Sequence, residues 1–368
     1  MGGIVTRPFQ NRKENRRLTR YADTQGRYEM AETANKTNRN PALDFTKGAL
    51  VLIMVLYHWI NYFYGPHDNR YLRFLTPSFI CITGFLISNI YLSKYDISDP
   101  RLPKRLCQRG LKILGVFLVL NIIRLLLVQG TFALPSFSDG SPASNLFDVY
   151  VVGSGVGGGQ TKAVAFFVLI PIGYVLILSA VLSIASRFYR YAFHIVCLIS
   201  LLSIVVLAGY GIQSPNLELV TIGLLGVIAG YLPRAKVDAL VQHPLLLGGA
   251  YILYLAAITL WNVIYPLQII GVFLSLMIIY RVGQTGESPG IAARITILLG
   301  KYSLFGYIAQ IAVLQMLHFG LKYLESRTLI LGSSFLLAFC LTILSVVIVD
   351  RVRAKSVVAN KMYGAVFA

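Results

Sequence analysis

The segment 39–58, RNPALDFTKGALVLIMVLYH, opens the first long apolar run of this chain and carries Asp44, Lys47 and His58 within it. On an α-helix, the spacing from Lys47 to His58 is a rotation of about 1100°, ~20° past three full turns, so both share one face about 16 Å apart along the axis. Asp44 precedes Lys47 at an ion-pair spacing. Ionisable groups are costly in a membrane helix and usually face a protein interior or a water-filled cavity. The segment therefore predicts a membrane helix with His58 deep inside and a salt-bridged pair nearer the cytoplasm.

The composition is typical of a polytopic membrane protein. Of the 368 residues, 56% are hydrophobic and only 13% are charged, whereas about 25% of residues in soluble domains are charged. The mean hydropathy is +0.67. The sequence predicts an all-α protein with about ten transmembrane helices. They are expected at 42–64, 71–93, 108–128, 162–184, 189–209, 216–233, 245–264, 266–281, 293–318 and 328–350.

The net charge of +18 follows from where Lys and Arg lie in the chain. Counted from a cytoplasmic N-terminus, most basic residues fall in inner loops and in the C-terminal tail. The outer loop 129–160 contains Asp139 and Asp148 and no basic residue. Because cytoplasmic loops collect Lys and Arg, both termini are expected in the cytoplasm and the protein in the plasma (inner) membrane. A nucleic-acid partner is not indicated.

Residues 1–40 are expected to form a disordered basic cytoplasmic tail, and residues 41–368 the membrane domain. The tail has nine Lys or Arg residues against four Asp or Glu and almost no apolar periodicity. The cysteines, Cys81, Cys107, Cys197 and Cys340, have no metal-site spacing and indicate no disulfide framework. No metal is therefore expected.

His58 is the sharpest candidate for chemistry. A neutral imidazole can take a proton from a hydroxyl and later return it, which is the work of a general base in acyl transfer. The alternative is a histidine that hydrogen-bonds a neighbouring helix. Lys47 is suited either to an anionic cofactor or to snorkelling. The Asp44–Lys47 pair is equally consistent with a structural role, because a buried ion pair is less costly than either ion alone.

A second cluster lies in the segment 104–112, KRLCQRGLK. Arg105, Arg109 and Lys112 recur at helical spacings of four and three, so they share a face. Three cations at a cytoplasmic membrane surface suit a phosphate-bearing ligand. Ordinary positive-inside charge is the competing interpretation.

A third group is a polar stripe in the segment 299–310, LGKYSLFGYIAQ, formed by Ser303, Tyr307 and Gln310 at i, i+4 and i+7. Such stripes either join membrane helices or line a cavity, here the one expected at His58. Arg124 and Glu218 are isolated candidates for the acceptor side, and snorkelling or interface anchoring explains them equally well.

These motifs resemble integral-membrane acyltransferase family 3 and its relatives, which include glucan succinyltransferases and heparan-α-glucosaminide N-acetyltransferase. That family opens with Leu-Asp and an R-x10-H pattern, matched here by Leu43-Asp44, Lys47 and His58. Further similarity lies at Thr83–Ile87, TGFLI, at the paired basic residues of the segment 104–112, at Leu299–Leu304, LGKYSL, and at Asp350-Arg-Val-Arg353 with Tyr363 and Phe367.

The resemblance implies a membrane acyltransferase domain over 41–368. It implies an acyl-CoA donor, such as acetyl-CoA, reached from the cytoplasm, and a carbohydrate or envelope glycoconjugate acceptor with a hydroxyl or amine on the far side. His58 would be the catalytic histidine and Lys47 its basic partner. Most members of the family have Arg where this chain has Lys47, and a lysine cannot form the two parallel hydrogen bonds that a guanidinium makes to an anion.

A proton-coupled small-molecule transporter is the alternative, with His58 and the Asp44–Lys47 pair as a proton relay. The chain shows no repeat symmetry, which weighs against that class. The acceptor and the oligomeric state do not follow from the sequence.

Overall fold

The computed structural model describes residues 40–63, 70–92, 94–95, 99–129, 147–153, 166–261, 263–284, 290–321 and 327–367. Ala42–Ala368 form one compact unit. Within the described ranges the regular structure is entirely helical. The predicted tail, up to residue 39, and most of the predicted outer loop 129–160 lie outside the described residues.

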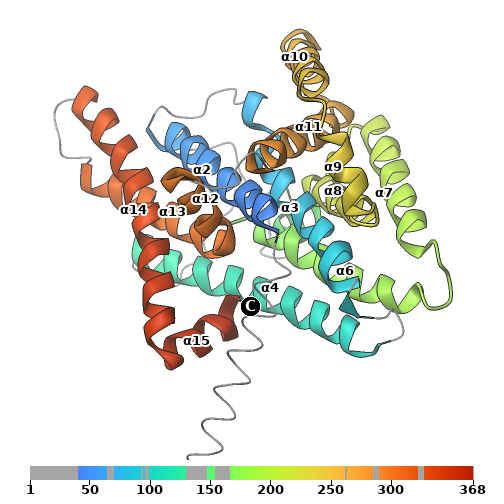
Figure 1. Ribbon diagram of the computed structural model, residues 1–368, viewed down its shortest axis with the longest axis horizontal. Coiled ribbons are helices and arrows are strands. Elements are labelled where there is room, and N and C mark those ends of the chain that lie inside the picture. The colour runs from blue at the N-terminus through green and yellow to red at the C-terminus, as the bar shows by residue number, and fades with distance from the viewer. Residues whose placement is uncertain are drawn as a thin grey trace, which may run out of the picture. The chain divides into compact units, whose positions relative to one another are not determined.

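The helices follow one another along the chain as shown in Figure 1. They are α2 (Pro41–Phe63), η1 (Arg70–Leu72), α3 (Leu75–Leu86), η2 (Ile87–Leu92), α4 (Arg101–Gln129), η3 (Asp148–Val152), α6 (Leu169–Ala185), α7 (Ala192–Gly209), α8 (Pro215–Ala229), α9 (Arg234–Leu240), α10 (Pro244–Trp261), α11 (Tyr265–Gln284), α12 (Ile291–Lys301), α13 (Ser303–Leu321), α14 (Arg327–Lys355) and α15 (Val357–Phe367).

Among the described residues, eight helical segments are long and apolar enough to cross a membrane. They lie in α2, in Arg70–Leu92, in α4, α7, α10, α11, α13 and in α14. The apolar helices α6 and α8 are shorter. At 1.5 Å per residue they measure about 26 and 23 Å, against ~30 Å for a hydrocarbon core. The protein is thus a helical membrane protein, as its composition predicts.

The segment predicted as one helix at 293–318 is instead two helices, α12 and α13, which meet at Tyr302. Tyr302 has non-helical torsion angles, φ −114° and ψ 29°. Its amide still donates to the carbonyls of Leu298 and Leu299, and its own carbonyl accepts from Gly306. The chain therefore bends without leaving these backbone groups unpaired, and a hydropathy average over the segment does not reveal the bend. The third predicted segment also begins earlier than expected, at Arg101.

Glycines allow the interior helices to approach closely. A Cβ added to Gly226 on α8 would lie 2.1 Å from the carbonyl oxygen of Cys81 on α3. A Cβ on Gly84 would lie 1.9 Å from the carbonyl oxygen of Gly223. Membrane helices commonly pack through such small residues. The α3–α8 pair is consequently tight, and α6 packs against both α8 and α4.

Glycines also allow α2 to approach α12 closely. A Cβ on Gly300 would lie 1.7 Å from the carbonyl oxygen of Asp44, and a Cβ on Gly48 would lie 1.8 Å from that of Thr296. Farther along, Val51 packs beside Gly306 of α13. Two helices distant in sequence from α2 are thereby placed along the face that carries Asp44.

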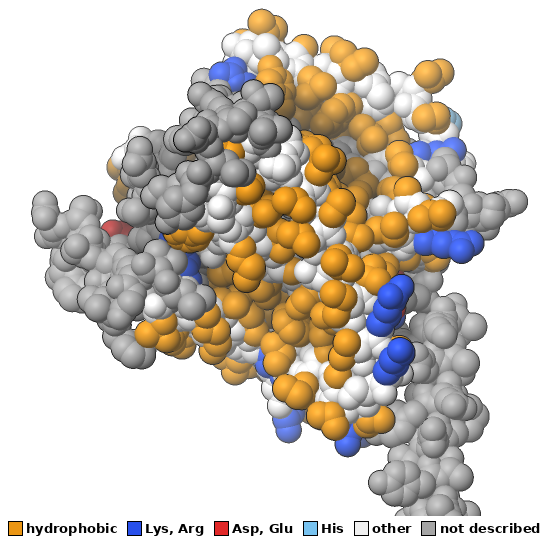
Figure 2. All heavy atoms as spheres, turned by 90° about the vertical axis from the view of Figure 1, so that its left-hand side faces the viewer, with side chains coloured by type: hydrophobic (Ala, Val, Ile, Leu, Met, Phe, Trp, Pro, Cys, Tyr) orange, Lys and Arg blue, Asp and Glu red, His pale blue; other side chains and the backbone are white. Residues whose placement is uncertain are grey.

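Apolar side chains cover much of the outer surface. Leu246 and Leu253 on α10 and Val205 on α7 are each about seven-tenths exposed. Figure 2 shows a largely hydrophobic face on the side of α13 and α14, with most of its Lys and Arg toward the lower and right-hand margins. Such a face requires a lipid environment rather than water.

Candidate functional site

The charged pair expected on the first helix is formed. The Lys47 Nζ lies 2.5 Å from the Asp44 Oδ1, and both side chains are largely buried. Asp44 lies in the first turn of α2, where the helix dipole favours a negative charge. Each charge compensates the other, as buried ions require.

His58 lies three turns farther along α2 and is half-buried. Its ring centroid is 5.2 Å from that of Tyr57 and 6.5 Å from that of Tyr307 on α13. Tyr307 is buried. The half-buried imidazole is therefore placed where α2 approaches α13.

The ring of Tyr307 is surrounded by other aromatic rings. Phe79 on α3 lies 6.4 Å away and Phe166, just before α6, lies 6.3 Å away, measured between centroids. Phe166 has a positive φ of 60°, which is uncommon for a residue with a side chain. Such backbone strain often occurs at functional sites. Sequence reasoning missed Phe166, because nothing in the chain indicates either its backbone conformation or its neighbour.

Gln310, one turn beyond Tyr307, completes the buried part of the predicted stripe. Its side chain is fully buried, and neither its Oε1 nor its Nε2 has a hydrogen-bond partner among the described residues. An unsatisfied buried amide costs about 1–3 kcal/mol and calls for a specific explanation such as a ligand or water. Ser303, the third member, begins α13 and is half-buried.

The basic cluster of α4 is paired with tyrosines. Arg105 donates to the hydroxyl of Tyr95, and Arg109 donates to that of Tyr91. Their guanidinium carbons lie 5.0 and 5.9 Å from the centroids of the same rings. Because a phenol is neutral, these contacts orient the guanidinium groups without cancelling their charge. Lys112, two turns beyond Arg105, is exposed.

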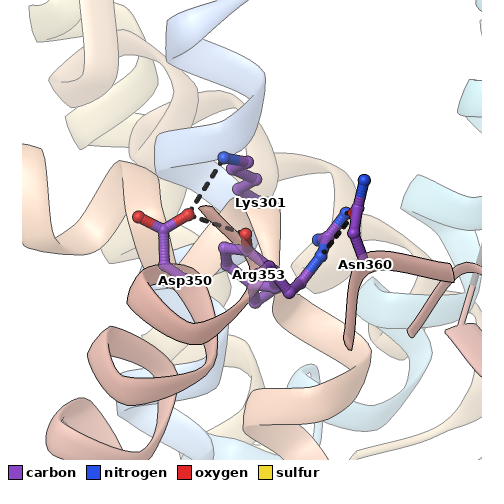
Figure 3. Close-up of polar contacts among 5 residues, drawn as sticks. Lys301, Asp350, Arg353 and Asn360 are labelled. Atoms are coloured by element: carbon purple, nitrogen blue, oxygen red, sulfur yellow. Dashed lines mark hydrogen bonds and ion pairs between the residues drawn. The ribbon is translucent and has the colours of Figure 1, made fainter. Parts of the chain in front are cut away.

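A polar group that the sequence did not single out lies where α12, α13 and α14 meet. The Lys301 Nζ lies 3.1 Å from the Asp350 Oδ1, and the Tyr302 hydroxyl donates to the same oxygen at 2.6 Å. Figure 3 shows Lys301 directed at Asp350, and Arg353 facing Asn360. The family-like motifs contain most of these residues, but no pattern within them indicates that they meet.

These contacts link the N-terminal part of α2 to the end of α14. Asp44 touches Gly300 through its main chain, and Lys301 and Tyr302 follow Gly300 directly. Arg353 lies over the ring of Tyr302, 5.2 Å from its centroid. The main chain of Asp44 is therefore close to the bend between α12 and α13, which Asp350 and Arg353 of α14 contact.

The two isolated candidates lie on α4 and α8. Arg124, on α4, is half-buried. Glu218, in the first turn of α8, is half-buried, and its main-chain carbonyl accepts from the Tyr265 hydroxyl at 3.0 Å. Among the described residues, no group of three or more His, Cys, Asp or Glu side chains is arranged to bind a metal ion.

The helical scaffold thus offers a half-buried imidazole beside a phenol, and a buried amide without a hydrogen-bond partner among the described residues, with cations carried by α2 and α4. Comparison of the chain with models of protein families, with curated proteins and with solved structures found no match.

Proposed function

We propose that this protein is a membrane acyltransferase with ten spans and both termini in the cytoplasm. It would move an acyl group such as acetyl from cytoplasmic acyl-CoA to a hydroxyl or amine of a carbohydrate or envelope acceptor at the outer face of the plasma membrane. The observation that carries the proposal is the position of His58, a titratable ring beside the buried Tyr307, on the same helix face as Lys47. The resemblance to acyltransferase family 3 supports the same reaction.

In this proposal His58 is the general base. Its neutral imidazole removes the proton from the acceptor hydroxyl, and the oxygen attacks the carbonyl carbon of the thioester. The carbon–sulfur bond breaks as the tetrahedral intermediate collapses, and His58 returns the proton to the departing thiolate. The products are the acylated acceptor and free CoA.

The neighbouring polar groups would stabilise the intermediate. Gln310 offers an amide N–H that has no hydrogen-bond partner among the described residues. Tyr307, whose ring centroid lies 6.5 Å from that of His58, offers a hydroxyl. Donors held in a dry site are effective partners for an oxyanion, because little reorganisation is needed during the reaction. Ser303 would line the same cavity, and Arg124 and Glu218 would contact the acceptor on the outer side.

The donor would enter from the cytoplasmic side. Arg105, Arg109 and Lys112 are proposed to bind the phosphates of CoA, because guanidinium groups oriented by tyrosines remain available to anions. Lys47 and His58 are about 16 Å apart along α2, a separation comparable to the length of an extended pantetheine arm. A thioester at His58 is therefore compatible with a nucleotide held at the cytoplasmic surface.

The test is incubation of the purified full-length protein, in lipid nanodiscs, with acetyl-CoA labelled on the acetyl group. We expect release of free CoA and transfer of label to an added carbohydrate acceptor, or slow hydrolysis without one. A protein that consumes no acetyl-CoA but moves a solute along a pH gradient in liposomes would contradict the proposal and support the transporter alternative.

A further inference from the structure

The C-terminal helix α15 holds an arginine of α14 in a defined position. The Arg353 guanidinium carbon lies 4.0 Å from the centroid of the Tyr363 ring and 5.2 Å from that of Tyr302. Asn360 accepts from its Nε at 3.1 Å and from its Nη2 at 2.7 Å. These are two of the five N–H donors of a guanidinium. The described residues accept from no other Arg353 donor, so three remain for another partner.

Arg353 also forms no ion pair with a carboxylate of the described residues. The nearby carboxylate, Asp350, accepts instead from Lys301 and from the Tyr302 hydroxyl. No carboxylate of the described residues lies within ion-pair distance of Arg353. A fixed guanidinium with spare donors and no ion-paired carboxylate is suited to a phosphate.

A second arginine lies on a helix that packs against α15. Helix α15 packs against α4, which carries Arg109. Burial raises the pKa of Tyr363, and the positive charges of Arg353 and Arg109 both oppose that rise. Arg109, like Arg353, has an aromatic partner, Tyr91, and no carboxylate in ion-pair contact within the described part of the chain.

Two like charges that both act on one neutral side chain repel each other. An anion bound between them removes that repulsion and satisfies their remaining donors. We propose that Arg353 and Arg109 together form a phosphate-binding subsite on Tyr363, which takes a phosphate from the nucleotide end of the acyl donor. The subsite deepens the proposed function and rests on it for the identity of the ligand. It makes α15, which sequence analysis left without a role, part of the donor site.

The test measures binding rather than catalysis. Full-length protein in nanodiscs of neutral phosphatidylcholine is titrated calorimetrically with CoA and with pantetheine, which lacks phosphates. Loss of a charged hydrogen-bonding partner predicts that Arg353→Gln binds CoA about 10- to 100-fold more weakly, with pantetheine binding unchanged. Arg353→Lys keeps the positive charge but loses the planar pair of donors of a guanidinium. Its CoA affinity is expected to lie between those of the wild type and Arg353→Gln.

Arg351→Gln is the matched control, because Arg351 is an exposed arginine on the same turn of α14, and it should bind CoA as the wild type does. Asn360→Ala keeps the charge of Arg353 but removes the hydrogen bonds that orient its guanidinium. Its loss of CoA affinity is expected to be smaller than that of Arg353→Gln. A thermal unfolding curve for each variant separates loss of binding from loss of folding.

The outcomes distinguish the subsite from the proposed reaction. Equal CoA affinity in Arg353→Gln and wild type would overturn the subsite even if the enzyme transfers acyl groups. Binding of CoA that depends on Arg353, in a protein without transferase activity, would support the subsite and contradict the reaction. A further measurement uses nanodiscs that contain phosphatidylglycerol. If the wild type retains this lipid, Arg353→Gln does not, and neither binds CoA, the ligand of the subsite is a lipid headgroup and the nucleotide assignment is overturned.

Discussion

The imidazole of His58 and the phenol ring of Tyr307 lie 6.5 Å apart, between centroids, at the contact of α2 with α13. His58 is half-buried and Tyr307 is buried. This pair joins a half-buried titratable group and a buried tyrosine between two helices of a membrane protein. The proposed acyl transfer depends on both.

Replacing Tyr307 with Phe removes the hydroxyl and retains the ring. Because the ring packs against Phe79 and Phe166, we expect the fold to be kept. Loss of one donor to a developing oxyanion should lower kcat by about 100-fold with little change in KM. Tyr210→Phe, at an exposed position beyond α7, is the control. Unchanged kcat in Tyr307→Phe would remove the hydroxyl from the mechanism.

Gln310→Leu is expected to make the protein more stable and less active. The amide is fully buried without a hydrogen-bond partner among the described residues, so a similar-sized apolar side chain should raise the free energy of unfolding by about 1–3 kcal/mol. Acyl transfer should fall if the amide serves the substrate. Thermal unfolding and labelled acetyl transfer measure the two effects. Gln315→Leu on the same helix is the comparison, and a destabilised but fully active Gln310→Leu would contradict this assignment.

Gly226→Ala tests the close contact between α8 and α3. The added methyl group would overlap the carbonyl oxygen of Cys81, so the helices must separate, at a cost of about 1–3 kcal/mol or more. Gly248→Ala on α10 meets no neighbour within 4 Å and should leave the unfolding temperature equal or slightly higher. Equal unfolding temperatures for the two variants would show that the α3–α8 contact is looser than described.

Tyr302→Phe should destabilise the bend between α12 and α13. The Tyr302 hydroxyl donates to Asp350, and its loss is expected to lower the free energy of unfolding by about 1–2 kcal/mol near neutral pH. Burial, and then the bond to Asp350, raise the pKa of Tyr302 above its usual 10.0. This contribution is therefore fully present below pH 10 and is lost as the pH rises through the raised pKa.

The measurement is thermal unfolding of wild type and Tyr302→Phe between pH 7 and pH 11. The difference between their unfolding temperatures should shrink only at the alkaline end. A difference that is constant over the range, or that grows with pH, would mean that the hydroxyl does not act as the donor to Asp350.

The sequence predicts most of the helices and part of the site, because those features depend on local spacing. Apolar length places the membrane helices, and an i, i+3 spacing places Asp44 beside Lys47. The contact of His58 with Tyr307 follows only in part, since the sequence suggests a shared cavity but gives no partner.

The remaining features depend on contacts between distant parts of the chain. The bend at Tyr302 lies inside a continuous apolar run, so its hydrophobicity does not reveal it. Phe166 reaches Tyr307 through an unusual backbone conformation. Arg353 meets Tyr302 only because α14 returns to the end of α12. Periodicity within a helix contains no information about which helices meet.

The most direct test of the account is acetyl transfer by the His58→Ala variant. Labelled acetyl-CoA is supplied on the cytoplasmic side of proteoliposomes, and transfer to an enclosed carbohydrate acceptor is measured for wild type, His58→Ala and His194→Ala. His194→Ala is the control, because the His194 imidazole stacks on Tyr231 at the exposed surface of α7. We predict that His58→Ala loses transfer completely while its thermal unfolding and CoA binding match the wild type, and that His194→Ala keeps full activity. Wild-type transfer by His58→Ala would contradict the account.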